Sequence, residues 1–130
     1  MENADFQFAD REMPRSIEAE QSILGAVLAD PSVLPLVVEK IKPEYFYSQQ
    51  HKSLYNIIMR MFTSGSNADI ITVLNEAEKL HIFETAAEGR RYLANLAEIL
   101  PSTANIESYC RIVAEKYYIR SLSYAARSIL

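Results

Sequence analysis

Glycine and cysteine are scarce in this chain of 130 residues, which contains three glycines and one cysteine. Tight turns between β-strands and loops that bind phosphate both depend on glycine, so the sequence favours a helical protein without a nucleotide-binding loop. The single cysteine, Cys110, excludes an internal disulfide bond and is typical of a reducing compartment. The chain has no apolar run of about 18 residues and no apolar segment of the secretory type at its N-terminus. These absences predict a soluble, cytoplasmic protein with no membrane span.

The chain also lacks an excess of positive charge, since its formal net charge is −4. Nucleic-acid binding needs a basic surface, so this balance argues against DNA binding by the chain. A helix-turn-helix reader is disfavoured as well, because the candidate recognition helix, residues 70–80, contains a single basic residue, Lys79. Hydrophobic residues make up 49% of the composition, which predicts one folded domain.

Sequence motifs for catalysis are missing too. The chain contains no GxxxxGK[ST], GxGxxG or GxSxG pattern, so it has neither a phosphate-binding loop nor a serine nucleophile elbow. His51 and His81 have no partner at a metal-binding spacing and are interpreted as surface or core histidines. Glu18 and Glu20 face different directions on a helix, and we expect both to be solvated. We therefore predict no catalytic, cofactor-binding or metal-binding residue.

The spacing of apolar residues predicts an all-α fold with a compact bundle of about five helices over residues 14–104. The expected helices cover residues 16–30, 33–41, 49–63, 70–80 and 86–99. Four residues of the type that caps helix N-termini stand at the start of the first segment or directly before the next three: Ser16, Ser32, Ser48 and Asp69. The inward positions are expected to include three residues near helix ends: Phe62, Leu80 and Ile99. Residues 1–13 are acidic and without helical period, and we expect a flexible tail there.

Two local features refine this bundle. Gly25 lies inside the first helix, where glycine costs about 1 kcal/mol relative to alanine, and we infer that it permits close approach of another helix. Residues 44–47, Glu-Tyr-Phe-Tyr, are expected to form a single helical turn that inserts an aromatic plug into the core.

The last predicted helix, residues 105–130, is longer than the body that carries it. Without glycine or proline it would extend about 39 Å, against about 34 Å for the diameter of a 100-residue globule. Apolar residues form two sets at helical spacing: Ile106, Cys110, Val113 and Tyr117, then Tyr118, Leu122, Ala125 and Ile129. Monomers avoid exposing such a stripe, so we predict that the second set packs against a partner helix. We also expect a fragment of a longer protein, because the helix reaches Leu130 without a capping glycine.

Several segments match a known family in order and at natural spacing. They are PRSIEAEQSILG at 14–25, EYFY at 44–47 followed by His51, SGSNADIIT at 64–72, Tyr92-Leu93 and PSTANIESY at 101–109. Together they resemble the N-terminal domain of the bacterial replicative DNA helicase family, DnaB. The resemblance covers residues 14–130, and only Pro35 and residues 81–88 depart from the family pattern.

The resemblance implies an all-helical domain in which residues 105–130 form the first arm of a dimerisation hairpin. The full-length protein would be a hexameric, ATP-dependent helicase of bacterial DNA replication, with ATP and Mg²⁺ bound in a motor domain absent from this chain. In this family, hairpins pair subunits into a trimer of dimers, and the same region recruits the primase DnaG. A helicase loader is a further candidate partner.

The expected contact residues follow from the long helix and from the family. The predicted hairpin contacts are Tyr118, Leu122, Ala125 and Ile129. Tyr92 is a candidate primase contact, with packing in the core as its alternative. For the chain as a whole, two alternatives are a helicase-binding domain of a primase and a generic helical adaptor.

Overall fold

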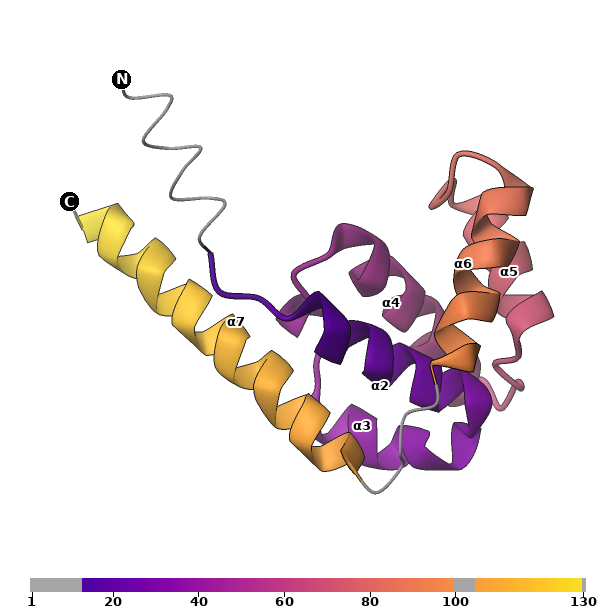
Figure 1. The fold of residues 1–130 in the computed structure, drawn as a ribbon, viewed down its shortest axis with the longest axis horizontal. Coiled ribbons are helices and arrows are strands. Elements are labelled where there is room, and N and C mark those ends of the chain that lie inside the picture. Colours follow the sequence, from indigo (N-terminus) through magenta and orange to yellow (C-terminus); the bar gives the residue numbers. More distant parts are fainter. Residues whose placement is uncertain (1–12, 100–104, 130) are drawn as a thin grey trace.

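The protein is all-α, as predicted. The computed structural model describes residues 13–99 and 105–129, and Figure 1 shows its helices in sequence order. The bundle consists of α2 (Ile17–Ala29), α3 (Leu34–Lys40), α4 (Gln49–Thr63), α5 (Ile70–Lys79) and α6 (Ala86–Glu98). Two short 3-10 turns, η1 (Pro31–Val33) and η2 (Pro43–Tyr45), precede α3 and α4, and α7 (Ile106–Ile129) follows the bundle.

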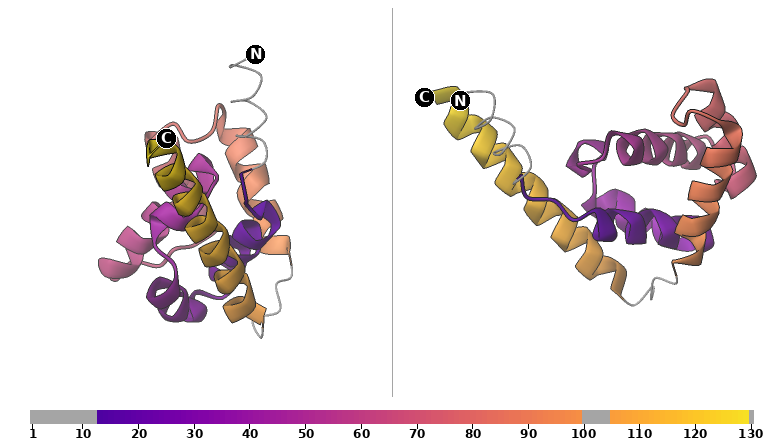
Figure 2. Two further views of the ribbon diagram at one scale, coloured as in Figure 1. Left: turned by 90° about the vertical axis from the view of Figure 1, so that its left-hand side faces the viewer. Right: turned by 45° about the horizontal axis from the view of Figure 1, so that its top comes forward.

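The long helix α7 projects beyond the bundle. Its first half packs on α2 and α3, with Ile106, Cys110 and Val113 buried, and it also contacts η2. Its C-terminal end extends away from the other helices in Figure 1 and in the right-hand view of Figure 2. The 24 residues of α7 correspond to a length of about 36 Å. The expected over-long helix is therefore present.

Helix α2 lies at the centre of the bundle and contacts α4, α6 and α7. Its residues from Ile23 to Val27 are all buried, because these three helices pack around them. Phe46, next to η2, has no exposed surface and packs against the ring of Tyr55 at a centroid distance of 5.1 Å. The predicted aromatic plug is thus confirmed.

Three of the four predicted helix caps are confirmed. The side chains of Ser16, Ser48 and Asp69 accept hydrogen bonds from backbone N–H groups in the first turns of α2, α4 and α5. The prediction for Ser32 is wrong. Asp30 accepts hydrogen bonds from both the backbone N–H and the hydroxyl of Ser32, which forms η1 and delays the start of α3 to Leu34.

The predicted inward positions at three helix ends are wrong. Phe62, Leu80 and Ile99 are 45%, 54% and 37% exposed. Leu80 and Ile99 are the residues that follow the last turns of α5 and α6, and Phe62 lies in the last turn of α4. Apolar periodicity continues there past the end of the packed surface.

Some expectations fall outside the described residues. These are the acidic tail, except Met13, which is buried, and the first part of the segment at 101–109. Within residues 13–99 and 105–129, no single helix has the length and hydropathy of a membrane span. Only α2 and η1–α3 taken together reach these values, and this pair is bent by 116°.

The crossing of α2 and α6 depends on Gly25. A Cβ atom at this position would overlap the backbone carbonyl of Leu96 on α6, a group that has no freedom to move aside. The close approach predicted for Gly25 is therefore observed, and it explains why a residue that weakens helices stands in the middle of α2.

We expect Gly25→Ala to lower the free energy of unfolding by about 2 kcal/mol, because overpacking outweighs the gain in helix propensity. Gly89→Ala is the matched control. Its Cβ would come within 2.8 and 2.9 Å of side-chain atoms of Phe83 and Leu74, which must move but are not backbone, so its cost should be clearly smaller than that of Gly25→Ala. Urea unfolding followed by circular dichroism measures both. Equal stability of the two variants would contradict the role given to Gly25.

Candidate protein–protein interface

The outer half of α7 carries an exposed apolar stripe, defined here as Tyr118, Leu122, Ala125 and Ile129. All four residues are exposed, and Leu122 and Ile129 are 71% and 86% accessible. At 3.6 residues per turn, this stripe lies about 120° around the helix axis from the set formed by Ile106, Cys110, Val113 and Tyr117. The inner set faces the bundle, whereas Leu122, Ala125 and Ile129 of the outer stripe are exposed to solvent.

Tyr118 marks the point where the stripe leaves the bundle. Its hydroxyl lies 2.9 Å from the hydroxyl of Tyr45, and its ring meets the Tyr45 ring edge-on at 5.6 Å. This hydrogen bond is the main cause that raises the pKa of Tyr45 to about 12. The other three stripe residues lie farther along the projecting helix, so Tyr118 differs from them in having a partner within its own subunit.

Arg120 fastens α7 to the bundle and was not identified from the sequence. The residue is 5% exposed, and its guanidinium donates hydrogen bonds to the backbone carbonyls of Pro14 and Tyr45 at 2.8 and 2.9 Å. It also lies over the rings of Tyr47 and Tyr117. Burial lowers the pKa of Arg120, and the nearby carboxylate of Glu20 opposes this shift. A signal was present in the sequence, because Arg120 follows Tyr117 by three residues and so extends the inner set.

The expectation that Glu20 is solvated is wrong. Glu20 is 1% exposed, and its carboxylate accepts hydrogen bonds from the backbone N–H groups of Tyr47 and Ser48 at 2.8 and 3.3 Å. It also accepts one from Nδ1 of His51 at 2.8 Å. These donors stand at the N-terminus of α4, where N–H groups lack partners within the helix and the helix dipole favours a negative charge. Glu20 therefore joins α2 to the start of α4.

His51 extends this buried network to α6. It is a core histidine, and its Nε2 lies 2.6 Å from the hydroxyl of Tyr92. Because the carboxylate of Glu20 only accepts, Nδ1 carries the proton, and in neutral His51 Nε2 accepts from Tyr92. Gln21 donates to the same hydroxyl at 3.4 Å. The hydroxyl of Tyr92 is thus directed into the bundle, while its side chain as a whole is half-buried.

Cys110 belongs to the packed surface of α7. Its side chain is buried, and burial raises the pKa of the thiol to about 11. The thiol is therefore protonated near neutral pH and behaves as a small apolar residue. This matches its place in the inner set between Ile106 and Val113.

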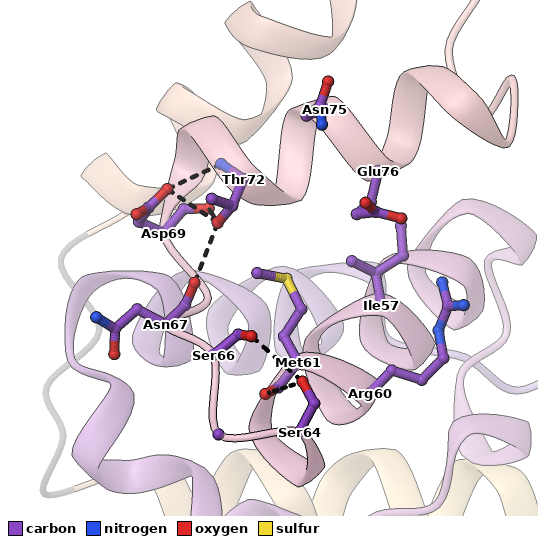
Figure 3. A pocket seen from close by; sticks show the side chains of 11 residues that line it. Ile57, Arg60, Met61, Ser64, Ser66, Asn67, Asp69, Thr72, Asn75 and Glu76 are labelled. Carbon is purple, nitrogen blue, oxygen red and sulfur yellow. Dashed lines mark hydrogen bonds between the residues drawn. The ribbon is translucent and has the colours of Figure 1, made fainter.

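A groove of about 820 Å³ lies between α4, residues 64–69 and α5, as Figure 3 shows. Several of its polar groups are hydrogen-bonded to one another. The hydroxyl of Thr72 donates to the carbonyl of Asn67 at 3.1 Å, and Asp69 accepts from the backbone N–H of Thr72 at 2.8 Å. The hydrogen bonds to Thr72 lower the pKa of Asp69. These contacts cap α5. No group of three metal-ligating side chains occurs in the described ranges, either here or elsewhere.

Removal of the buried carboxylate should destabilise the bundle. We expect Glu20→Ala to lower the free energy of unfolding by about 3 kcal/mol, because two backbone N–H groups and His51 lose their acceptor. Glu18→Ala, an exposed position on the same helix, should change it by less than about 0.5 kcal/mol. Chemical denaturation of both variants provides the measurement, and a Glu20 variant as stable as its control would disprove the assigned role.

Comparison with known proteins gives consistent matches along most of the chain. The family model described as the DnaB-like helicase N terminal domain matches residues 12–115. The replicative DNA helicase DnaB of Geobacillus stearothermophilus is 40% identical over 122 residues, which are 94% of this chain and 27% of the relative. The replicative DNA helicase DnaC of Bacillus subtilis (strain 168) is 38% identical over 120 residues, 92% of this chain and 26% of that protein.

A solved structure matches the fold as well. It is the crystal structure of the N-terminal domain of DnaB helicase from Mycobacterium tuberculosis, with a TM-score of 0.83 and 32% sequence identity. The match covers 91% of this chain and 85% of that one. The chain spans about a quarter of the length of the curated relatives named above, whereas it spans most of the isolated domain.

Proposed function

The chain belongs to the family of DnaB-like helicase N-terminal domains. We propose that it mediates the assembly of a hexameric, ATP-dependent replicative DNA helicase and provides a docking surface for the partners of that helicase. The full-length protein would act in bacterial DNA replication in the cytoplasm. Its ATP and Mg²⁺ would bind in a motor domain outside this chain. The family match and the replicative helicases among the relatives favour this function over the helicase-binding domain of a primase and over a generic adaptor.

The exposed apolar stripe of α7 is the observation that carries the assembly role. Leu122 and Ile129 are among the most exposed large apolar residues of the described chain, and they lie on the part of α7 that leaves the bundle. Full burial of one such side chain is worth roughly 2 kcal/mol before the costs of association. A second helix laid along the stripe would bury both residues together with Ala125.

The form of the assembly follows from this stripe. In our proposal α7 is the first arm of a helical hairpin, and hairpins from two subunits pack together to form a dimer. Three such dimers would make the collar of a hexamer. The inner set of α7 is already committed to the bundle, so the stripe, about 120° away around the helix, is the side available to the partner helix.

Primase docking is the second part of the proposal. We assign Tyr92 to the surface that binds the primase DnaG, with a helicase loader as a further partner of the domain. The hydroxyl of Tyr92 is held by His51 and its ring lies against Phe83, but the side chain is only half-buried, so part of it is accessible to a partner. Tyrosine is enriched at protein interfaces because it combines a large apolar ring with a polar end.

Leu122→Asp tests the assembly role. We expect the self-association constant of the full-length protein to fall by at least about tenfold, because a carboxylate would have to be buried against the partner helix. Helix content should remain unchanged, since Leu122 makes no core contact in the subunit. Ser128→Asp places the same charge on an exposed position of α7 outside the stripe and should leave association intact. Analytical ultracentrifugation and circular dichroism supply the data. Undiminished association, or a collapse of helicity, would count against the stripe as an interface.

Two substitutions at Tyr92 separate docking from packing. Tyr92→Phe removes only the hydroxyl, so it should cost about 1 kcal/mol of stability and leave primase binding unchanged. Tyr92→Ala removes the ring and should weaken primase binding by at least about tenfold in calorimetry with purified primase. Asn95→Ala, an exposed change on the same helix, is the control. If the folded alanine variant bound primase normally, the role of Tyr92 would be confined to the core.

A further inference from the structure

Two residues of the projecting half of α7 make hydrogen bonds to the bundle: Tyr118 makes one exposed bond between side chains, to Tyr45, and Arg120 makes two to backbone carbonyls. The two hydrogen bonds of its guanidinium reach carbonyls in separate segments: Pro14 precedes α2, and Tyr45 ends η2. Beside it, the rings of Tyr45 and Tyr117 stack with their centroids 4.5 Å apart. We call Arg120, Tyr45 and Tyr117 the arm latch. The latch lies where α7 passes the last part of the bundle that it touches.

The remaining contacts of α7 constrain its direction less. Ile106, Cys110 and Val113 occupy the first third of the helix and pack through apolar contact, which is not directional. A charge-assisted hydrogen bond, in contrast, fixes both distance and orientation. Two such bonds from one planar guanidinium to two segments of the bundle restrain tilt and rotation together. Without them, the contacts left near this point of the arm are the stacked rings of Tyr45 and Tyr117 and the exposed hydrogen bond between the Tyr118 and Tyr45 hydroxyls.

We propose that Arg120 is the positioning residue that sets the angle of the arm, and that its release lets α7 pivot about the contact made by Ile106, Cys110 and Val113. The arm measures about 28 Å from Cys110, the middle of this contact, to Ile129, so a pivot of about 10° would move its tip by about 5 Å. Packed helices lie about 8–10 Å apart, so a shift of this size is large enough to break the register of a hairpin interface. The latch therefore determines where the apolar stripe is presented.

The function of this angle in subunit pairing rests on the proposed assembly role. The angle between α7 and the bundle, however, is a property of one subunit. It can be measured in this chain at low concentration, whether or not subunits associate. An unchanged angle in Arg120 variants would overturn the latch and leave the assembly proposal intact. Intact self-association of Leu122→Asp would overturn the assembly proposal and leave the latch intact.

The experiment measures the distance between spin labels on cysteines introduced at Asn56 of α4 and Ser128 of α7, both exposed. Cys110 is buried and should react slowly with the label. Arg120→Lys keeps the positive charge but has a single ammonium group, which cannot make both bonds in the same geometry. Arg120→Gln removes the charge as well. Arg127→Lys, an exposed position on the same helix, is the matched control.

The parent protein and Arg127→Lys should give one narrow distance distribution by pulsed electron spin resonance. Both Arg120 variants should give a distribution broadened by at least about twofold, with helix content unchanged, because apolar contacts and one exposed hydrogen bond between tyrosine side chains restrain the arm less than the two bonds of a buried guanidinium. A single narrow distribution in both variants would overturn the proposal. So would loss of helicity in both, because Arg120 would then support the bundle itself and not the direction of the arm.

Discussion

The bundle depends on the buried carboxylate of Glu20, a charge with 1% exposure that must find its hydrogen bonds inside the protein. Its donors are backbone N–H groups at the N-terminus of α4 and the ring of His51. The other ring nitrogen of His51 is hydrogen-bonded to Tyr92 of α6. One side chain of α2 thereby fixes the positions of two other helices. Apolar packing alone would allow these helices to slide, whereas the geometry of the hydrogen bonds allows one arrangement.

A second buried charge joins the arm to this arrangement. Arg120 binds the carbonyl of Pro14, ahead of α2, and that of Tyr45, just before the segment whose N–H groups Glu20 holds. The two groups have opposite charges, and the carboxylate of Glu20 offsets part of the effect of burial on the pKa of Arg120. The bundle and the arm are therefore held by one continuous polar layer, although most of the area between them is apolar.

Much of the fold could be predicted from the sequence because it is encoded locally. Apolar spacing gave the helices, capping side chains gave the starts of α2, α4 and α5, and Gly25 indicated the close crossing. Glu20 and Arg120 could not be placed in the same way, because local rules treat charged residues on helices as solvated. Their partners lie 27 to 31 and 75 to 106 residues away in the sequence. The available signal was periodicity, since Glu20 precedes Leu24 by one turn and Arg120 continues the inner set of α7.

Polar and apolar contacts have different roles in this domain. Every buried side-chain nitrogen and oxygen in the described part of the chain has a hydrogen-bond partner, so the polar layer is complete within one subunit. The stripe of α7 is the opposite case: Leu122, Ala125 and Ile129 are apolar and exposed, and in the proposed assembly they become buried when another helix packs on them. Polar contacts within the subunit can therefore fix the place at which an apolar contact between subunits forms. Such an order of events requires the arm to have a defined direction before association, and this is the constraint that Arg120 imposes.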